Sequence, residues 1–289
     1  MTAINSEIFE AFQRDGFAVI EDFYSPPEVY HMLKEAKKII SHAPKEDRVV
    51  FSVTDPQLTR KRDQFQIDSA EILSYFFRAD AFNEKNELIV PEEFALNRVG
   101  HALSVVNDAF KRYTFDNRVR EVLWQLGYQR PAVAQSMIIF KNPGVGGEIL
   151  PHQDGTFLQT EPQSAVGLWI ALEDATIENG CLHFISGSHK TGIHRRFIRN
   201  PDETSNELLI FDRSLPTYQK SSMIPCPVKK GSLVLIHNQV LHGSKQNTTD
   251  KSRTAFTFHV VETKDTKWSP ENWLQVKNPF PILYEKDAS

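Results

Sequence analysis

Apolar residues recur every three or four positions through much of residues 1–130, and this spacing predicts helices. The clearest case is PPEVYHMLKEAKKII, where two prolines at 26 and 27 suit the first turn of a helix and the apolar positions then keep helical spacing. We also predict helices over 68–80 and from about 93 to 127. The intervening segment 43–66 is charged and only weakly periodic, so we interpret it as a loop whose Arg-Lys-Arg run faces solvent.

After Pro131 the pattern changes to short apolar or alternating runs separated by Gly, Pro and Asn. Such runs are typical of β-strands. We predict strands over 132–141, 166–173, 181–186, 232–237, 239–243 and 254–262. Short strands at regular spacing favour a mainly β fold, an antiparallel sandwich or jelly roll.

The chain has no low-complexity linker and no internal repeat. We therefore expect one domain over residues 1–289, in which the helical part buttresses the sheet. In this interpretation residues 1–130 give mainly helical support, 131–262 form the jelly-roll core, and 263–289 are a C-terminal extension.

Composition narrows the possible partners. With 40% hydrophobic and 24% charged residues the chain is ordinary globular material, and its net charge of −4 gives no basic field for nucleic acid or an anionic membrane. No apolar run approaches the roughly 18 to 20 residues that span a bilayer, and we find no signal-peptide pattern and no SKL-type peroxisomal ending. We expect an intracellular, cytoplasmic protein that acts on a small molecule, with a monomer as the default.

Two cysteines, Cys181 and Cys226, are too few for a disulfide framework and lack the CxxC spacing of zinc or redox motifs. The candidate chemistry therefore lies elsewhere, in the stretch EILPHQDGTF, where His152 stands two positions before Asp154. With 10 His and 16 Asp in 289 residues, about 0.55 such pairs are expected by chance, so the pair alone is uninformative.

A third metal ligand should come from a later strand, because neighbours in sequence cannot surround an ion. His189 and His194 occupy a loop, and His183 and His259 lie within strands, where a structural role is the simpler interpretation. His237 and His242 share one segment, and His242 is favoured because it ends a strand eleven residues before Arg253.

An arginine at the start of an inward-facing strand can offer a planar fork to a carboxylate, so Arg253 indicates a dicarboxylic cosubstrate. Two imidazoles and one carboxylate on one face of an octahedral ion leave three positions open, as in non-haem Fe(II) oxygenases. A structural zinc site would leave none.

Several stretches resemble the phytanoyl-CoA dioxygenase family of Fe(II)/2-oxoglutarate oxygenases: QSMIIFK, GGEILPHQD, LWIALEDATIENGCLHFISGSHKTG, KKGSLVLIHNQVLHGSKQN and SRTAFTFHVVE. The resemblance implies a double-stranded β-helix core and a dioxygenase that couples oxidative decarboxylation of 2-oxoglutarate to hydroxylation of a substrate. It implies His152, Asp154 and His242 as iron ligands, and O2 as the oxidant with ascorbate as a supporting reductant. For 2-oxoglutarate it implies contacts from Met137, Gln153, Trp169, Ser244 and Arg253.

The family has a lysine contact in a stretch that here reads NRVGHAL, so Arg98 stands in its place with a different geometry. Met137 shares a strand face with Gln135 and Ile139, and Trp169 alternates against Leu168 and Ile170, so it points to the opposite side of its sheet.

Two other functions remain open from the residues. One is a zinc-dependent cupin-like hydrolase or isomerase that uses the same three ligands, and the other is a catalytically silent module that binds a metal or a 2-oxo acid. The family suggests an acyl-CoA substrate, but no motif marks a CoA site. Trp268, Trp273 and the segment 43–66 either cover the pocket mouth or pack at the surface.

Overall fold

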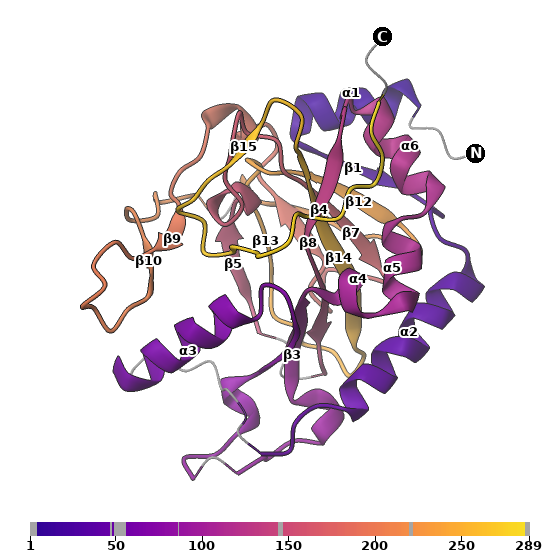
Figure 1. Ribbon diagram of the computed structural model, residues 1–289. Coiled ribbons are helices and arrows are strands. Elements are labelled where there is room, and N and C mark those ends of the chain that lie inside the picture. Colours follow the sequence, from indigo (N-terminus) through magenta and orange to yellow (C-terminus); the bar gives the residue numbers. More distant parts are fainter. Residues whose placement is uncertain are drawn as a thin grey trace.

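Two antiparallel sheets face each other in the computed structural model, which describes residues 5–46, 48, 56–85, 87–143, 147–219 and 222–286 (Figure 1). Within the described residues the larger sheet has seven strands in the order β1-β12-β7-β14-β4-β3-β2. Their bounds in that order are Phe17–Ile20, Leu233–His237, Val166–Ala171, Arg253–Glu262, Pro131–Lys141, Leu96–His101 and Leu73–Phe77.

The smaller sheet carries much of the candidate site, and its order is β11-β8-β13-β5. These strands span Ile224–Cys226, Leu182–Phe184, His242–Ser244 and Ile149–His152. Two short antiparallel pairs complete the described β structure: β9 (Phe197–Arg199) with β10 (Leu209–Phe211), and β6 (Thr160–Glu161) with β15 (Lys267–Trp268). The facing sheets confirm the predicted mainly β, double-stranded β-helix fold. The strands expected after Pro131 are present, but the one predicted over 239–243 is β13 (His242–Ser244), so that His242 begins this strand instead of ending it.

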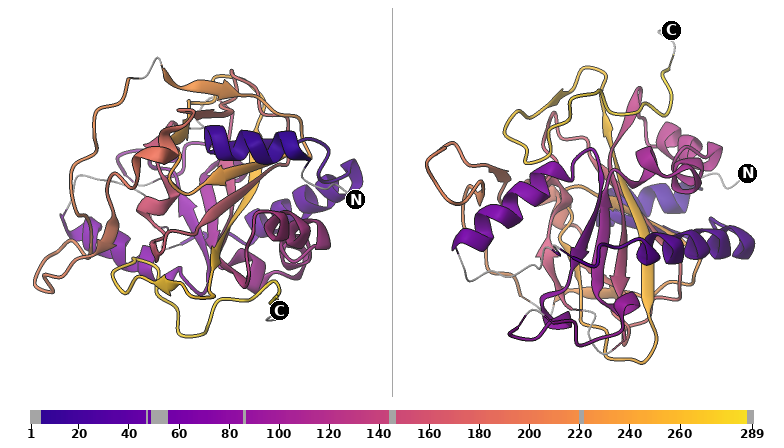
Figure 2. Two further views of the ribbon diagram at one scale, coloured as in Figure 1. Left: turned by 90° about the horizontal axis from the view of Figure 1, so that it is seen from above. Right: turned by 60° about the horizontal axis from the view of Figure 1, so that its bottom comes forward.

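Most of the described helices cover the outer face of the larger sheet and lie away from β9 and β10, whereas α3 (Pro56–Asp68) lies on the same side of the molecule as those two strands (Figures 1 and 2). The helices are α1 (Ser6–Asp15), α2 (Pro26–Ser41), α3 (Pro56–Asp68), α4 (Leu103–Val106), α5 (Asp108–Thr114) and α6 (Asn117–Gln125). As the two prolines suggested, α2 starts at Pro26. A capping box between Ser25 and Glu28 provides hydrogen-bond acceptors for the free backbone N–H groups at its N-terminus. Four single-turn helices lie at Ala79–Ala81, Glu92–Phe94, Asp154–Thr156 and Ser188–Thr191.

Alternation along β7 divides the core into two layers. Leu168 and Ile170 pack toward the helices, whereas Trp169 joins the cluster between the sheets that contains Phe184 and Ile236. Trp169 thus points to the side of the sheet opposite Leu168 and Ile170, as its alternation with them predicted. The helices bury the outer layer, and each Å² of apolar surface removed from water stabilises the fold by about 25 cal/mol. This packing holds the larger sheet rigidly beside the cavity.

Two helix predictions for the first 130 residues were wrong, one of them only in part. The 68–80 segment contains strand β2 instead of a helix, and the 93–127 segment begins with strand β3 before its helices. Both strands extend the larger sheet beyond β4, which would otherwise expose an unpaired edge. The first 130 residues therefore also supply β1, β2 and β3 to the sheet, in addition to helical support.

The segment 43–66 is only partly a loop, because α3 begins at Pro56, while residues 47 and 49–55 lie outside the described part of the chain. Tertiary contacts hold this weakly amphipathic helix: Phe65 packs edge-on against Phe76, with ring centroids 5.1 Å apart. The side chain of Asp63 is buried and accepts hydrogen bonds from the backbone N–H groups of Leu208 and Leu209.

The C-terminal extension returns to the sheets. Its strand β15 pairs with β6, Ile282 bridges to Ala132, and Trp273 is only 2% exposed. Among the described residues, no helix is both long and apolar enough to cross a membrane.

Candidate metal centre and cosubstrate cavity

His152, Asp154 and His242 form a compact cluster where β5 meets β13. The two histidines are direct partners across these antiparallel strands, and their ring centroids lie 4.3 Å apart. Oδ1 of Asp154 lies 3.8 Å from Nε2 of His152 and 3.6 Å from Nε2 of His242. One ligand atom from each residue falls within 4.8 Å of the others, so the three side chains could hold one metal ion.

Both imidazoles are held in the tautomer that a metal requires. Nδ1 of His152 lies 2.9 Å from the carbonyl oxygen of Leu150, and Nδ1 of His242 lies 3.1 Å from that of Val240. Since a carbonyl oxygen can only accept, each Nδ1 donates its proton there and each Nε2 keeps a free lone pair. Although 23% of the His152 side chain is reached by solvent, burial lowers its pKa to about 4, so the ring is neutral at pH 7.

A fourth side chain, His259 on β14, positions the Asp154 carboxylate. Its Nε2 lies 3.1 Å from Oδ2 of Asp154, and its Nδ1 lies 3.2 Å from Nε2 of Gln135. Because the Gln135 amide N–H donates to Nδ1, the His259 proton sits on Nε2, the ring nitrogen that lies next to the carboxylate. Burial raises the pKa of Asp154, but His259 and His242 outweigh it, and the pKa lies well below its usual range. Oδ1 is left for the metal.

The cluster opens into a cavity of about 490 Å³ between the sheets, which Met137, Trp169, Ser244 and Arg253 also line. Arg253 is 1% exposed, and its Nη2 donates to the carbonyl oxygen of Gly180 at 3.0 Å. Its guanidinium carbon lies 5.4 Å from the centroid of the Trp169 ring. Burial lowers the pKa of Arg253 to about 10, so the group remains a cation at pH 7.

Several buried polar atoms in this part of the cavity lack a hydrogen-bond partner among the described residues. They are Nε and Nη1 of Arg253 and Oγ of Ser244. Unsatisfied buried donors are rare and costly, since each one left unpaired costs about 1–3 kcal/mol. A carboxylate group would satisfy a guanidinium and a hydroxyl together, so the donor set fits a carboxylic acid.

Arg98 and Gln153 occupy different surroundings. Arg98 lines the cavity, donates from Nη2 to Oε1 of Gln66 at 3.1 Å and lies over the Phe76 ring. Gln153 is not among the residues that line the cavity, and its amide bonds to the backbone of Gly192, Gln239 and His194. The expected contact of Gln153 with the cosubstrate is therefore not supported, because alternation turns this side chain away from its two neighbours.

His259, Gln135 and His101 line the cavity without having been predicted as site residues. Of the two tryptophans expected either at the pocket mouth or at the surface, Trp273 lines the cavity, whereas Trp268 packs against Phe280 outside the lining. The sequence could have predicted that His259 faces the cavity. It lies six residues after Arg253 on one strand, and residues an even number apart share a strand face.

Solved structures show the same fold. The chain superposes with a TM-score of 0.63 on SnoK, a non-haem alpha-ketoglutarate-dependent carbocyclase from nogalamycin biosynthesis, at 18% identity over 98% of both chains. EctD from S. alaskensis, solved with 2-oxoglutarate and 5-hydroxyectoine, gives 0.62 at 18% identity, over 96% of this chain and 82% of its own. The facing sheets therefore form a double-stranded β-helix, and the His-Asp-His cluster supplies the two imidazoles and one carboxylate that are typical of a non-haem Fe(II) centre.

The chain belongs to the phytanoyl-CoA dioxygenase (PhyH) family, whose model matches residues 12–255. It is 43% identical to phytanoyl-CoA dioxygenase domain-containing protein 1 of Danio rerio, over 98% of this chain and 100% of that protein. A phytanoyl-CoA dioxygenase of Arabidopsis thaliana is 39% identical over 97% of both chains. The resemblance carried by the sequence motifs is thereby confirmed.

Proposed function

We propose that the protein couples the oxidative decarboxylation of 2-oxoglutarate to the hydroxylation of a second substrate. In the balanced reaction, 2-oxoglutarate, O2 and a substrate C–H bond give succinate, CO2 and a C–OH group. One observation supports this proposal above all: two features line the same cavity. One is the set of three residues that could hold a metal ion, and the other is a buried arginine with unpaired N–H donors that a carboxylate could accept from.

In this proposal His152, Asp154 and His242 hold Fe(II), which when bound supplies the redox chemistry of the oxo acid and O2. Arg253 and Ser244 bind the far carboxylate of 2-oxoglutarate. Trp169 and Met137 wall the cosubstrate and exclude water, and Arg98 supplies a further positive charge on the lining. The protein thus contributes binding, orientation and a dry pocket.

The test is succinate formation by the full-length protein, loaded anaerobically with Fe(II) and then given 2-oxoglutarate, O2 and ascorbate. We expect slow turnover without a second substrate. His152→Ala should abolish it, since it removes a ligand. Arg253→Leu should chiefly raise the KM for 2-oxoglutarate, because charge-assisted hydrogen bonds are worth about 1.5–3 kcal/mol each.

Metal analysis and cosubstrate binding separate this function from its alternatives. A zinc-dependent hydrolase would retain zinc and form no succinate from 2-oxoglutarate, and a silent binding module would be stabilised thermally by 2-oxoglutarate without turning it over. The complete absence of succinate from folded, iron-loaded protein would overturn the proposal.

A further inference from the structure

Beyond the metal cluster the cavity has an aromatic wall, defined by Phe157, Phe197 and Phe211. Phe157 lies 5.6 Å from Phe197 and 6.4 Å from Phe211, measured between ring centroids. The wall reaches the metal cluster, because the Phe157 centroid is 5.9 Å from that of His152. A substrate packed on these rings would therefore lie beside the metal ligands.

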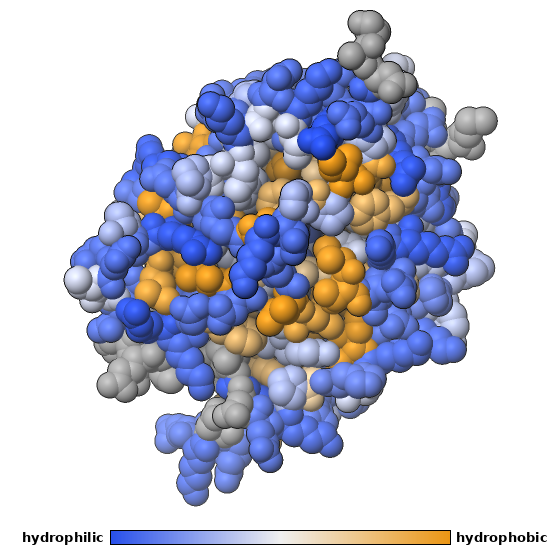
Figure 3. All heavy atoms as spheres, in the orientation of Figure 1, coloured by the Kyte–Doolittle hydropathy of each residue, from blue (hydrophilic) through white to orange (hydrophobic). Residues whose placement is uncertain are grey.

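The mouth of the cavity is apolar as well. Leu150 and Phe211 line the cavity, yet are 65% and 40% exposed. Figure 3 shows apolar surface among hydrophilic residues in the region of β5, β9 and β10. Exposed apolar side chains next to a cavity are typical of a binding site for an apolar group.

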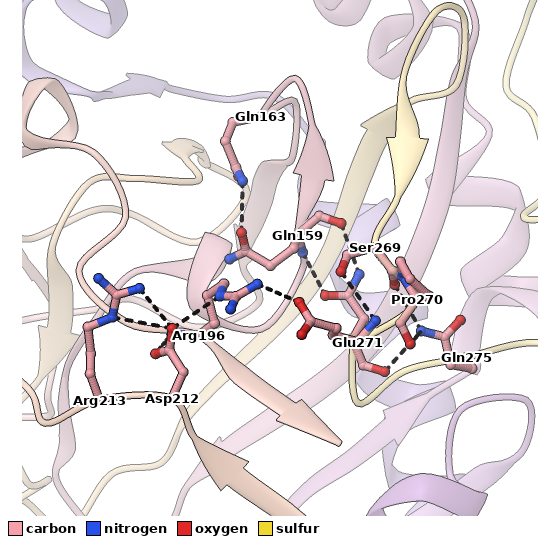
Figure 4. Close-up of polar contacts among 10 residues, drawn as sticks. Gln159, Gln163, Arg196, Asp212, Arg213, Ser269, Pro270, Glu271 and Gln275 are labelled. Carbon is pink, nitrogen blue, oxygen red and sulfur yellow. Dashed lines mark hydrogen bonds and ion pairs between the residues drawn. The ribbon is translucent and has the colours of Figure 1, made fainter. Parts of the chain in front are cut away.

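Arg195 stands at this wall without a direct ion pair among the described residues. Its guanidinium carbon lies 3.6 Å from the Phe211 ring centroid. Burial lowers the pKa of Arg195, and the more distant Tyr218 and Asp212 offset this lowering only in part. The neighbouring arginines differ: Arg196 and Arg213 both contact the carboxylate of Asp212, as Figure 4 shows. Of these three arginines only Arg195 lines the cavity.

The charges of the lining favour an anion. Fe(II) and Arg253 together would balance the charges of 2-oxoglutarate and Asp154, and Arg62 contacts Asp63 at 2.8 Å. The described lining contains two carboxylates, Asp63 and Asp154, so its two other arginines, Arg98 and Arg195, give it a net positive charge. Arg98 donates to Gln66, whereas Arg195 lies at the aromatic wall. In a partly desolvated cavity an uncompensated cation attracts an anionic ligand.

The wall is held in place before any ligand binds. Asp63 on α3 accepts backbone hydrogen bonds from Leu208 and Leu209, at 3.0 and 3.1 Å, and Arg60 donates to the carbonyl oxygen of Ser205 at 2.7 Å. These contacts fasten α3 to the β9–β10 hairpin, which carries Phe197 and Phe211. Preorganisation of this kind lowers the entropy cost of binding.

We propose that the second substrate is a small organic anion, with an apolar or aromatic body on the Phe157–Phe197–Phe211 wall and a carboxylate or phosphate group at Arg195. This inference rests on the proposed function for its chemistry. A cavity of about 490 Å³ that also holds 2-oxoglutarate suits a compact body, since pockets for drug-sized ligands span roughly 300–1,000 Å³.

The experiment measures stimulation of succinate formation above the rate without a second substrate, using the iron-loaded full-length protein. Its probes are aryl and cyclohexyl carboxylates, phosphate esters with the same bodies, the matching uncharged amides, and CoA thioesters. We expect the carboxylates or the phosphates to stimulate turnover and the amides not to, and the stronger of the two series identifies the anion.

Substitution then tests the residue. Arg195→Gln should raise the half-maximal concentration of a stimulating anion about 10- to 100-fold, as expected for loss of a charge-assisted hydrogen bond, and Arg195→Lys should recover part of it. Arg213→Gln is the matched control, because its side chain contacts Asp212 and lies outside the cavity lining.

Stimulation by amides or CoA thioesters alone, stimulation by none of the probes, or equal behaviour of Arg195→Gln and Arg213→Gln would overturn the inference. Failure of the proposed function looks different, since succinate formation would then be absent before any second substrate is added.

Discussion

Gly167 on β7 gives the sharpest test of how the metal cluster is built. A Cβ atom added at Gly167 would lie 2.9 Å from Oδ2 of Asp154. It would also lie 3.3 Å from the Cβ of Ile236 and 3.5 Å from Cδ2 of His259. The residue lies in an ordinary strand, so Gly167→Ala introduces crowding without a forced backbone conformation.

The size of the effect follows from these distances. Ordinary contact begins near 3.4 Å, so the carboxylate must withdraw by about half an ångström, and Ile236 leaves the new methyl group little room to retreat. Such a shift disturbs the contact between Oδ2 and His259, and it also moves Oδ1 out of the position in which it would bind the metal. Loss of support around a metal ligand weakens metal binding by about 10- to 100-fold, or about 1.4–2.7 kcal/mol.

The assay is anaerobic titration of the apo-protein with Co(II), followed by its visible absorption. Gly147→Ala is the control, because a Cβ there would meet nothing within 4 Å. Urea unfolding of both apo-variants separates weaker metal binding from a general loss of packing. If Gly167→Ala binds Co(II) as tightly as Gly147→Ala, the rigid placement of Asp154 is refuted.

Three further predictions concern single side chains. His259→Leu should weaken Co(II) binding about tenfold and His259→Gln less, because only the amide can still donate to Asp154; equal affinities in the same titration would contradict this. Lys141→Met should lower the free energy of unfolding in urea by about 1–3 kcal/mol, since Nζ donates to the carbonyl oxygens of Gly147 and Lys245, and an unchanged midpoint would count against it. Burial and His189 lower the pKa of His237 from 6.5 to about 4, so the unfolded chain binds a proton that the folded protein does not. This contribution to stability is present above pH 6.5 and is lost as the pH falls toward 4, with a slope of at most about 1.4 kcal/mol per pH unit. His237→Gln should flatten that slope in urea unfolding at a series of pH values, and an identical slope would be inconsistent with a neutral, buried His237.

Strand β3 shows why the first part of the chain was harder to predict than the second. Leu96, Val99, Gly100 and His101 are all buried, because β3 lies between β2 and β4 with the core on one face and the cavity on the other. A strand buried on both faces loses the alternation that identifies strands from sequence. The spacing of Leu96, Val99 and Leu103 fits a helix equally well, and the tertiary pairing with β4 decides the outcome.

The candidate site was readable where its residues are close in sequence or share a strand. His152 and Asp154 are two apart, and alternation from Arg253 along β14 leads to His259, although a histidine within a strand was interpreted as structural. Arg195 carries no such signal, since it lies in a run of two arginines of which the second is the one that contacts Asp212. The role that we propose for Arg195 depends on the position of the β9–β10 hairpin. Asp63, about 145 residues away along the chain, holds this hairpin through its hydrogen bond to Leu208. In our proposal substrate selection thus depends on a long-range contact. Asp63→Asn should loosen that contact and weaken the stimulation of succinate formation by an anionic substrate, without changing the KM for 2-oxoglutarate that we assign to Arg253.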